Sequence, residues 1–242
     1  MSLLSADEDT PRYYSFKDFL SETEAASFFE LTHAEQVVKV THYLDFLGQQ
    51  KSYALFKTSP KASISFAKLQ SDCGTTRDIY SAVVSFALDA KLLKKLLEGR
   101  TRSGFGAFGT EDGFLSQKRL SLAVAASVEE IGHTYIIERN KHEDVRPPVL
   151  NSRSFFFYWC HAEKQKLIDI KEKLTARNLP ANERRMYWEH ITIVVDRAMC
   201  NDCISFAKCL AHFEMASISI EDPDVARIFP PAPNMAVIHL PK

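Results

Sequence analysis

Apolar residues recur at helical intervals through most of the first hundred positions. The stretch over 34–47 carries them at Val37, Val38, Val40, Tyr43, Leu44 and Leu47. Spacings of three and four residues are typical of an amphipathic helix. Similar stripes predict helices over 22–31 and 76–97, and Pro60, which suits a first helical turn, predicts a short helix through Leu69. We therefore expect an all-α region over residues 13–98, preceded by a flexible tail at 1–12.

Glycine is concentrated in one short stretch that follows. Gly99, Gly104, Gly106, Gly109 and Gly113 are five of the chain's eight glycines. Because glycine favours loops, this composition predicts a linker and a domain boundary over residues 99–115. The segment from Gly104 to Gly109 also matches the dinucleotide-binding pattern G-x-G-x-x-G. It follows a predicted helix rather than a strand, so we interpret it as linker.

Beyond the glycines, strand-like and helix-like runs alternate. Runs rich in aromatic and β-branched residues predict strands over 133–139, 154–159, 191–196, 216–220 and 235–240. Alanine- and leucine-rich or amphipathic runs predict helices over 116–131, 161–177 and 200–213. This alternation indicates an α/β fold, which we place over residues 116–242.

Composition excludes several classes of protein. The chain has 242 residues, 45% of them hydrophobic, with 30 basic against 31 acidic side chains. It contains no apolar run of about 18 residues, so we expect no membrane span, and its acidic start does not resemble a secretory signal. We therefore expect an intracellular protein, cytoplasmic or nuclear. Five cysteines are an odd number, which predicts thiols or metal ligands rather than a disulfide framework.

Two short motifs carry the candidate chemistry: H-A-E from His161 to Glu163, and C-N-D-C from Cys200 to Cys203. Each follows a predicted strand and begins a predicted helix. If the two strands are parallel neighbours, both helix starts lie at one end of the sheet. One imidazole and two thiolates are three ligands of the kind that catalytic zinc uses, with the fourth position left for water. We therefore predict one zinc ion at His161, Cys200 and Cys203.

Glu163 is the candidate catalytic residue. It lies two positions from the predicted histidine ligand, from where its carboxylate could take a proton from the metal's water and deliver it to a substrate. Two other interpretations of the cysteines stay open: a redox pair of the thioredoxin type, and a structural zinc site, which would need a fourth protein ligand. The presence of His161 and Glu163 favours catalytic zinc over both.

H-A-E followed by C-N-D-C at helix starts resembles the signature of the zinc-dependent cytidine deaminase-like superfamily. Within it, ITIVVDRAMCNDC followed by ISFAK is most similar to the branch of DYW-type, bacterial-toxin-like and fungal nucleic-acid deaminases. The resemblance implies a three-layer α/β domain with a mixed five-stranded sheet, whose last two strands form an antiparallel pair. It also implies that Glu163 shuttles protons while His161, Cys200 and Cys203 bind zinc.

The implied reaction is hydrolytic deamination of cytosine to uracil, with single-stranded DNA or RNA as the favoured substrate. Asn151, Trp159 and Ala162 are the candidate substrate contacts, the first because related enzymes use an asparagine upstream of the histidine. Two alternatives remain open: deamination of free nucleosides such as cytidine, or of free bases, and a binding module that holds zinc without turnover. The sequence names no partner for the helical region.

Two further features have structural interpretations that we weigh against functional ones. A second H-A-E, beginning at His33, follows Thr32, and Thr32 with Glu35 predicts a capping box at a helix start. Seven basic residues lie among three acidic ones from Lys164 to Arg185. This run is either a solvated helix face or a track for phosphates beside the site.

Overall fold

A computed structural model describes residues 15–50, 62–70, 88–106, 110–134, 159–230 and 236–239. The N-terminal helices are α1 (Phe16–Phe19), α2 (Glu22–Ser27), the 3₁₀ turn η1 (Phe28–Glu30) and α3 (His33–Gln49). The later helices are α5 (Ala90–Leu97), α6 (Gln117–Ser127), α7 (Ala162–Thr175), α8 (Ala181–Glu189) and α9 (Asn201–Glu214). The strands are β1 (Ile64–Leu69), β2 (Thr101–Arg102), β3 (Ile191–Val195), β4 (Ile218–Glu221), β5 (Val225–Phe229) and β6 (Ala236–His239).

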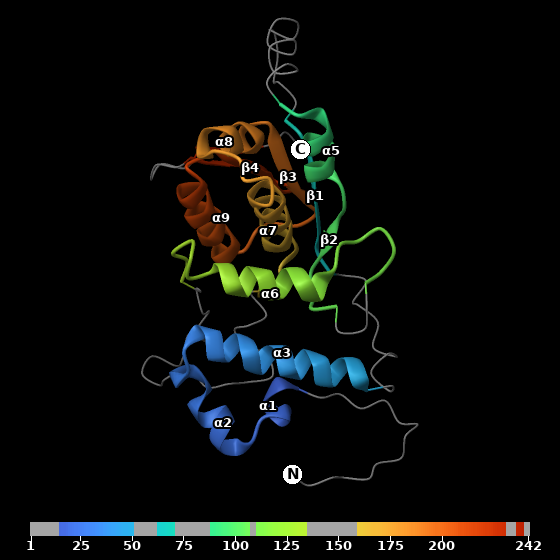
Figure 1. Ribbon diagram of the computed structural model, residues 1–242, viewed down its shortest axis with the longest axis vertical. Helices are drawn as coiled ribbons and strands as arrows, with labels where there is room; N and C mark the ends of the chain where they lie inside the picture. The colour runs from blue at the N-terminus through green and yellow to red at the C-terminus, as the bar shows by residue number, and fades with distance from the viewer. Residues whose placement is uncertain are drawn as a thin grey trace, which may run out of the picture.

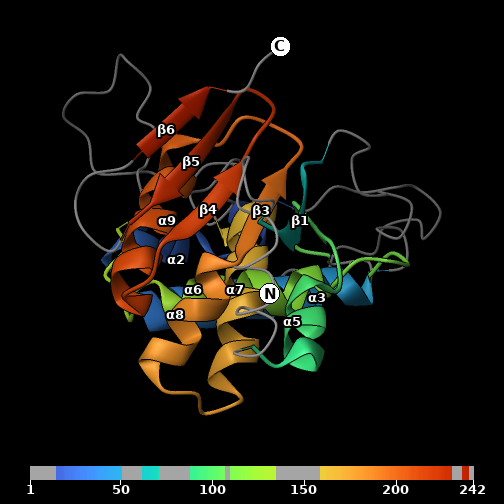
Figure 2. The same ribbon diagram turned by 90° about the horizontal axis from the view of Figure 1, so that it is seen from above.

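The strands form one mixed sheet in the order β2-β1-β3-β4-β5-β6. β3 and β4 are parallel and are joined by α9, whereas the other neighbouring pairs are antiparallel. Helices α7 and α8 contact β3, and α9 contacts β5, so these helices pack against the sheet (Figures 1 and 2). The α/β class and the helical N-terminal segment predicted from the sequence are confirmed. Five strands have four residues or more, and the sixth, β2, adds two residues at one edge.

The N-terminal helices lie against α6, on the side away from the sheet (Figure 1). Their core is aromatic: the ring centroids of Phe16 and Phe28, and those of Phe16 and Tyr43, are 5.2 Å apart. Lys118 of α6 forms an ion pair with Asp45 of α3. The predicted capping box at Thr32 is confirmed, with the Thr32 side chain and Glu35 bonded reciprocally at the start of α3. The second H-A-E motif is therefore a helix start far along the chain from the cysteines.

The predicted helix from Pro60 to Leu69 is wrong where the structure describes it. Residues Ile64–Leu69 form β1, which pairs with β2 on one side and β3 on the other. Ser65 and Ala67 are buried while Phe66 between them is 40% exposed, which is the alternation of a strand with one face covered. The region 13–98 is therefore not all-α, and the sheet begins before the predicted linker.

Several other expectations are corrected or narrowed. The predicted strand pair at the C-terminus is interrupted by β5, which was not predicted and which pairs antiparallel with both β4 and β6. Helix α8 was also missed. Of the helix predicted over 76–97, the described part is α5, which begins after its N-cap Asp89. The predicted strands over 133–139 and 154–159 lie almost entirely outside the described residues, and Trp159 and Cys160 form a 3₁₀ turn.

Candidate metal centre

The three predicted zinc ligands lie at the first turns of two neighbouring helices. His161 is the N-cap of α7, and Cys200 is the N-cap of α9. The backbone of Cys200 is extended, with φ −76° and ψ 161°, and its Sγ accepts a hydrogen bond from the Cys203 backbone N–H at 3.4 Å. The spacing C-x-x-C therefore turns both sulfur atoms toward the same side of the helix start, as the sequence predicts.

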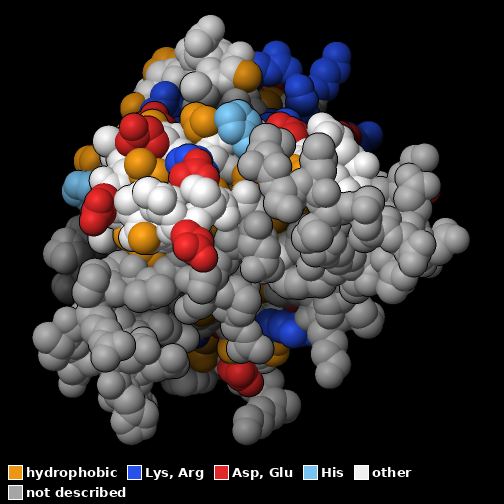
Figure 3. Space-filling view, turned by 90° about the horizontal axis from the view of Figure 1, so that it is seen from below, with side chains coloured by type: hydrophobic (Ala, Val, Ile, Leu, Met, Phe, Trp, Pro, Cys, Tyr) orange, Lys and Arg blue, Asp and Glu red, His pale blue; other side chains and the backbone are white. Residues whose placement is uncertain are grey.

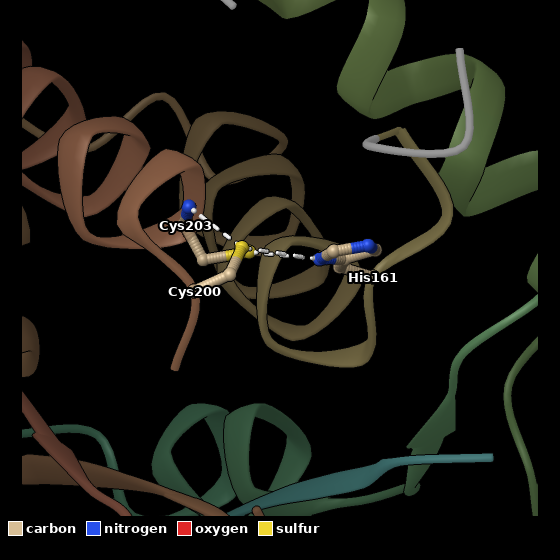
Figure 4. Close-up of side chains that lie close together, drawn as sticks. All are labelled: His161, Cys200 and Cys203. Atoms are coloured by element: carbon tan, nitrogen blue, oxygen red, sulfur yellow. Dashed lines mark hydrogen bonds between the residues drawn. The ribbon is translucent and has the colours of Figure 1, made fainter. Parts of the chain in front are cut away.

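The side chains of these residues converge (Figure 4). His161 Nδ1 lies 3.2 Å from Cys203 Sγ and 3.6 Å from Cys200 Sγ. All three candidate ligand atoms lie within 4.8 Å of one another. Cys203 is buried, while His161 and Cys200 are half-buried. The structure thus brings together residues that are about forty positions apart in the chain.

The donor set and its spacing fit a zinc ion. With Zn–S near 2.3 Å and Zn–N near 2.0–2.1 Å, a tetrahedral site separates nitrogen from sulfur by about 3.6 Å. The Nδ1–Sγ distance to Cys200, 3.6 Å, equals that value, and the distance to Cys203, 3.2 Å, is 0.4 Å shorter. Among the described residues, no fourth histidine, cysteine or carboxylate belongs to the group. One imidazole and two thiolates are a ligand set that zinc uses in proteins.

The ionisation of the ligands also favours a cation. A hydrogen bond from the Cys203 thiol, with a second from His161, lowers the pKa of Cys200 to about 4. Burial raises the pKa of Cys203 well above its usual value. Burial of the His161 ring opposes protonation, yet its bond to Cys200 and the charge of Glu163 leave the pKa of His161 raised. These shifts place a thiolate at Cys200 beside a protonated thiol at Cys203. A metal cation that binds both sulfur atoms can displace the proton of Cys203.

Glu163 lies in the first turn of α7 and is 5% exposed. Its negative charge contributes to the raised pKa values of both His161 and Cys203. Glu163 follows the candidate ligand His161 by two residues in the same helical turn.

Strand β2 anchors the start of α7. Thr101 Oγ1 donates to the Ala162 carbonyl at 2.7 Å, and the Ala162 N–H donates to Ser103 Oγ at 3.1 Å. The Gly104 N–H donates to the Cys160 carbonyl at 3.0 Å. Gly104 has φ +119°, a conformation that an L side chain rarely adopts. The described part of the glycine-rich segment thus holds the histidine ligand's backbone in place, a role that the linker interpretation missed.

The candidate substrate contacts lie in different settings. Ala162 is fully buried beside His161. Trp159 is also fully buried, and its ring meets that of His33 from the N-terminal helices at 5.6 Å and 74°. Asn151 lies outside the described residues. His33 Nε2 also lies 2.6 Å from the carbonyl oxygen of Ala125 in α6. The N-terminal segment therefore contacts both α6 and, through Trp159, the turn that precedes α7.

The basic run from Lys164 to Arg185, interpreted from the sequence as a solvated helix face or a phosphate track, is largely paired with acidic side chains. Six of its seven basic residues form ion pairs: Lys164, Lys166, Lys171, Lys173, Arg184 and Arg185. Lys164 and Lys166 are fully buried. The run is therefore a set of internal and surface ion pairs. Three of the acidic partners, Asp202, Glu130 and Glu214, come from other parts of the chain, so their pairing could not be seen in the local sequence. On the side of the N-terminal helices, too, acidic side chains lie next to basic ones (Figure 3).

Comparison with known proteins finds a similarity to one deaminase family. The sequence model of the family described as "Single-strand DNA deaminase toxin A, C-terminal" matches residues 100–167. The chain is similar to a deaminase family over that segment. The segment contains β2, α6 and the first turns of α7, and so includes His161 and Glu163 but ends before Cys200. A search among curated proteins finds no relative of this chain.

The match and the ligand geometry share only His161. One rests on sequence that precedes the cysteines, and the other on contacts that the cysteines make. Together they support a deaminase with a metal site. Over the described residues, no helix is long and apolar enough to cross a bilayer.

Proposed function

We propose that this protein is a zinc-dependent deaminase that converts cytosine to uracil in single-stranded DNA. The observation that carries the proposal is the convergence of His161, Cys200 and Cys203 within 4.8 Å, with Glu163 in the adjoining helical turn. The similarity of residues 100–167 to a single-strand DNA deaminase toxin family supports both the reaction and the choice of DNA. It also favours the toxin-like branch of the superfamily over the DYW-type and fungal branches.

His161 Nδ1 and the sulfur atoms of Cys200 and Cys203 would hold one zinc ion. When bound, zinc supplies Lewis acidity that activates a water molecule at neutral pH. Glu163 accepts a proton from that water and delivers protons to the cytosine ring nitrogen and to the departing amine. Cytosine and water thereby become uracil and ammonia. The burial of Glu163 keeps bulk water from competing for those protons.

A basic and aromatic ledge beside β2 supports a single-stranded substrate. The guanidinium of Arg100 lies 4.7 Å from the centroid of Phe114, and that of Arg102 lies 5.6 Å from it. Arg100 is exposed. Ser103, the next residue after Arg102, bonds to the start of α7. Cationic and aromatic side chains side by side are the means by which proteins hold unpaired nucleotides. We propose that the strand enters along this ledge toward the candidate ligands.

The test is an assay with a fluorescent single-stranded oligonucleotide that contains one cytosine. Uracil would be revealed by uracil-DNA glycosylase followed by alkaline cleavage. The same sequence as duplex DNA and as RNA, together with free cytidine, would be assayed in parallel by mass spectrometry. We expect single-stranded DNA to react fastest. Faster reaction of RNA or of cytidine would contradict the proposed substrate while leaving the deaminase intact.

Glu163→Gln separates catalysis from binding. The amide keeps the size of the side chain but cannot shuttle protons, so we expect turnover to fall by at least about 10²–10⁴-fold. Zinc content, measured by atomic emission, and the thermal unfolding midpoint should stay at the wild-type values. Equal inactivity of wild type and variant on every substrate would overturn the enzymatic proposal in favour of a binding module.

A further inference from the structure

A buried charged cluster lies behind the metal centre. Lys164 Nζ forms an ion pair with Asp202 Oδ2, and His133 Nε2 lies 3.2 Å from the other carboxylate oxygen, Asp202 Oδ1. The side chains of Lys164 and His133 are fully buried, and that of Asp202 is 1% exposed. The ring of Phe206 completes the cluster, with the Lys164 ammonium 5.3 Å from its centroid and the His133 ring centroid also at 5.3 Å.

The position of the cluster in the sequence ties it to the candidate site. Lys164 follows Glu163 directly, in the first turn of α7. Asp202 lies between the two cysteine ligands, in the first turn of α9. His133 follows the C-terminal end of α6. The ion pair therefore joins the two helical turns that present Glu163 and the candidate ligands, and His133 contacts Asp202 from outside both helices.

A contribution to folding stability does not by itself explain why the buried ion pair of Lys164 and Asp202 is present. Taking two charges out of water costs several kcal/mol for each ion, and well-packed apolar residues of similar volume often stabilise a fold as well or better. A lysine in the first turn of a helix is also opposed by the helix dipole. The pair instead links Lys164, next to Glu163 in α7, with Asp202, which lies between the two cysteines in α9.

We propose that Lys164 and Asp202, braced by His133, are positioning residues of the metal centre. The pair fixes the first turns of α7 and α9 relative to each other, and so sets where the Glu163 carboxylate lies with respect to the three ligand atoms. The effect on turnover rests on the proposed function, whereas the effect on the metal site does not.

The test compares two buried ion pairs of the same helix. In the first variant, Lys164→Met with Asp202→Asn removes both charges, so that neither is left buried alone. The control is Lys166→Met with Asp169→Asn. Lys166 and Asp169 are equally buried and paired at 2.9 Å, but Lys166 donates to the carbonyls of Leu96 and Glu98 rather than contacting a ligand-bearing turn.

Each variant would be loaded with cobalt(II), whose absorption bands report ligand geometry, and its affinity for zinc and its kinetics would be measured. For the first variant we expect shifted cobalt bands, a zinc affinity about 10–100-fold lower, and a kcat lower by a similar factor with unchanged KM. We expect the control to keep the wild-type bands and kcat, whatever its thermal midpoint. Wild-type bands and kcat in both variants would overturn the proposal.

The experiment separates failure of the proposed function from failure of the positioning role. If the wild-type protein deaminates nothing, the proposed function fails, but the cobalt spectra and zinc affinities still decide whether the pair positions the ligands. If the first variant does not fold, His133→Ala and His133→Gln replace it, because they leave the ion pair in place. The proposal requires shifted cobalt bands in His133→Ala and wild-type bands in His133→Gln, whose amide keeps a polar group of similar reach beside Asp202. Unshifted bands in His133→Ala would then overturn it.

Discussion

Zinc binding to the metal-free protein should release protons, and the structure indicates how many. Cys200, with a pKa of about 4, is already a thiolate at neutral pH. Cys203 has its pKa raised well above 9.0, and His161 has its pKa raised above 6.5. A metal must displace a proton from each of these two residues. We therefore expect about two protons released per zinc below the pKa of His161 and about one above it.

The magnitude follows from linkage. Each released proton changes the association constant tenfold per pH unit, or about 1.4 kcal/mol. Because protons compete with the metal, affinity rises with pH. The zinc association constant should rise about 100-fold per pH unit where His161 is protonated, and about tenfold per unit once it is neutral. Competition with a chromophoric chelator across this range gives the slope, and calorimetry in buffers of different ionisation enthalpy counts the protons.

Two cysteine variants provide the comparison. Cys203→Ala removes a ligand and should abolish tight binding. Cys209→Ala removes a thiol that contacts the Gly132 carbonyl at 3.6 Å and takes no part in the site, so it should keep the wild-type slope. An affinity that does not change with pH, or a Cys203→Ala protein that binds zinc as tightly as wild type, would refute the assignment of the ligands.

Three further predictions concern the scaffold. Thr32→Ala removes the side-chain cap of α3 and should lower the free energy of unfolding by about 1 kcal/mol; an unchanged thermal midpoint would contradict this. Glu214 is 2% exposed and accepts from Arg184 Nε at 3.1 Å and Trp188 Nε1 at 3.4 Å. Glu214→Ala leaves the buried Trp188 N–H without this acceptor and the half-buried Arg184 without this ion pair, and should cost about 2 kcal/mol in urea denaturation, whereas a loss below 1 kcal/mol would show that the cluster is not needed. Burial alone would raise the pKa of Asp222, but hydrogen bonds from an arginine and three backbone N–H groups lower it below 3.8. Its stabilisation is therefore present above pH 3.8 and is lost as pH falls through the lowered pKa. Asp222→Asn should flatten the decline of the thermal midpoint with acid, and an equally steep decline would contradict the assignment.

The helices that carry the candidate ligands could be predicted from the sequence. Their signals are local, since apolar stripes mark 161–177 and 200–213, and C-x-x-C lies at a helix start. The structure has helices at 162–175 and 201–214. The residues of the candidate site could be predicted for the same reason. A metal needs particular side chains at particular spacings, and those spacings are visible in the sequence.

The strand β1 shows where local signals were too weak. It is only six residues long, and its alternation of Ile64, Phe66 and Lys68 with Ser65 and Ala67 competes with the helix signal of a preceding proline. Its stability comes from two partners far along the chain, β2 and β3. Propensity over a short window cannot represent hydrogen bonds made more than a hundred positions away.

The sequence by itself determined which residues make up the candidate site, because the identity and spacing of His161, Glu163, Cys200 and Cys203 are properties of the chain. Only the tertiary structure decided which charged residues serve that site. Lys164 belongs to a basic run that the sequence assigns to solvent or to phosphates, and Asp202 was an unremarked residue between two cysteines. Their pairing depends on the packing of α7 against α9. A buried charge is tolerated only where the fold supplies its partner, and a partner supplied by another helix has no trace in local sequence.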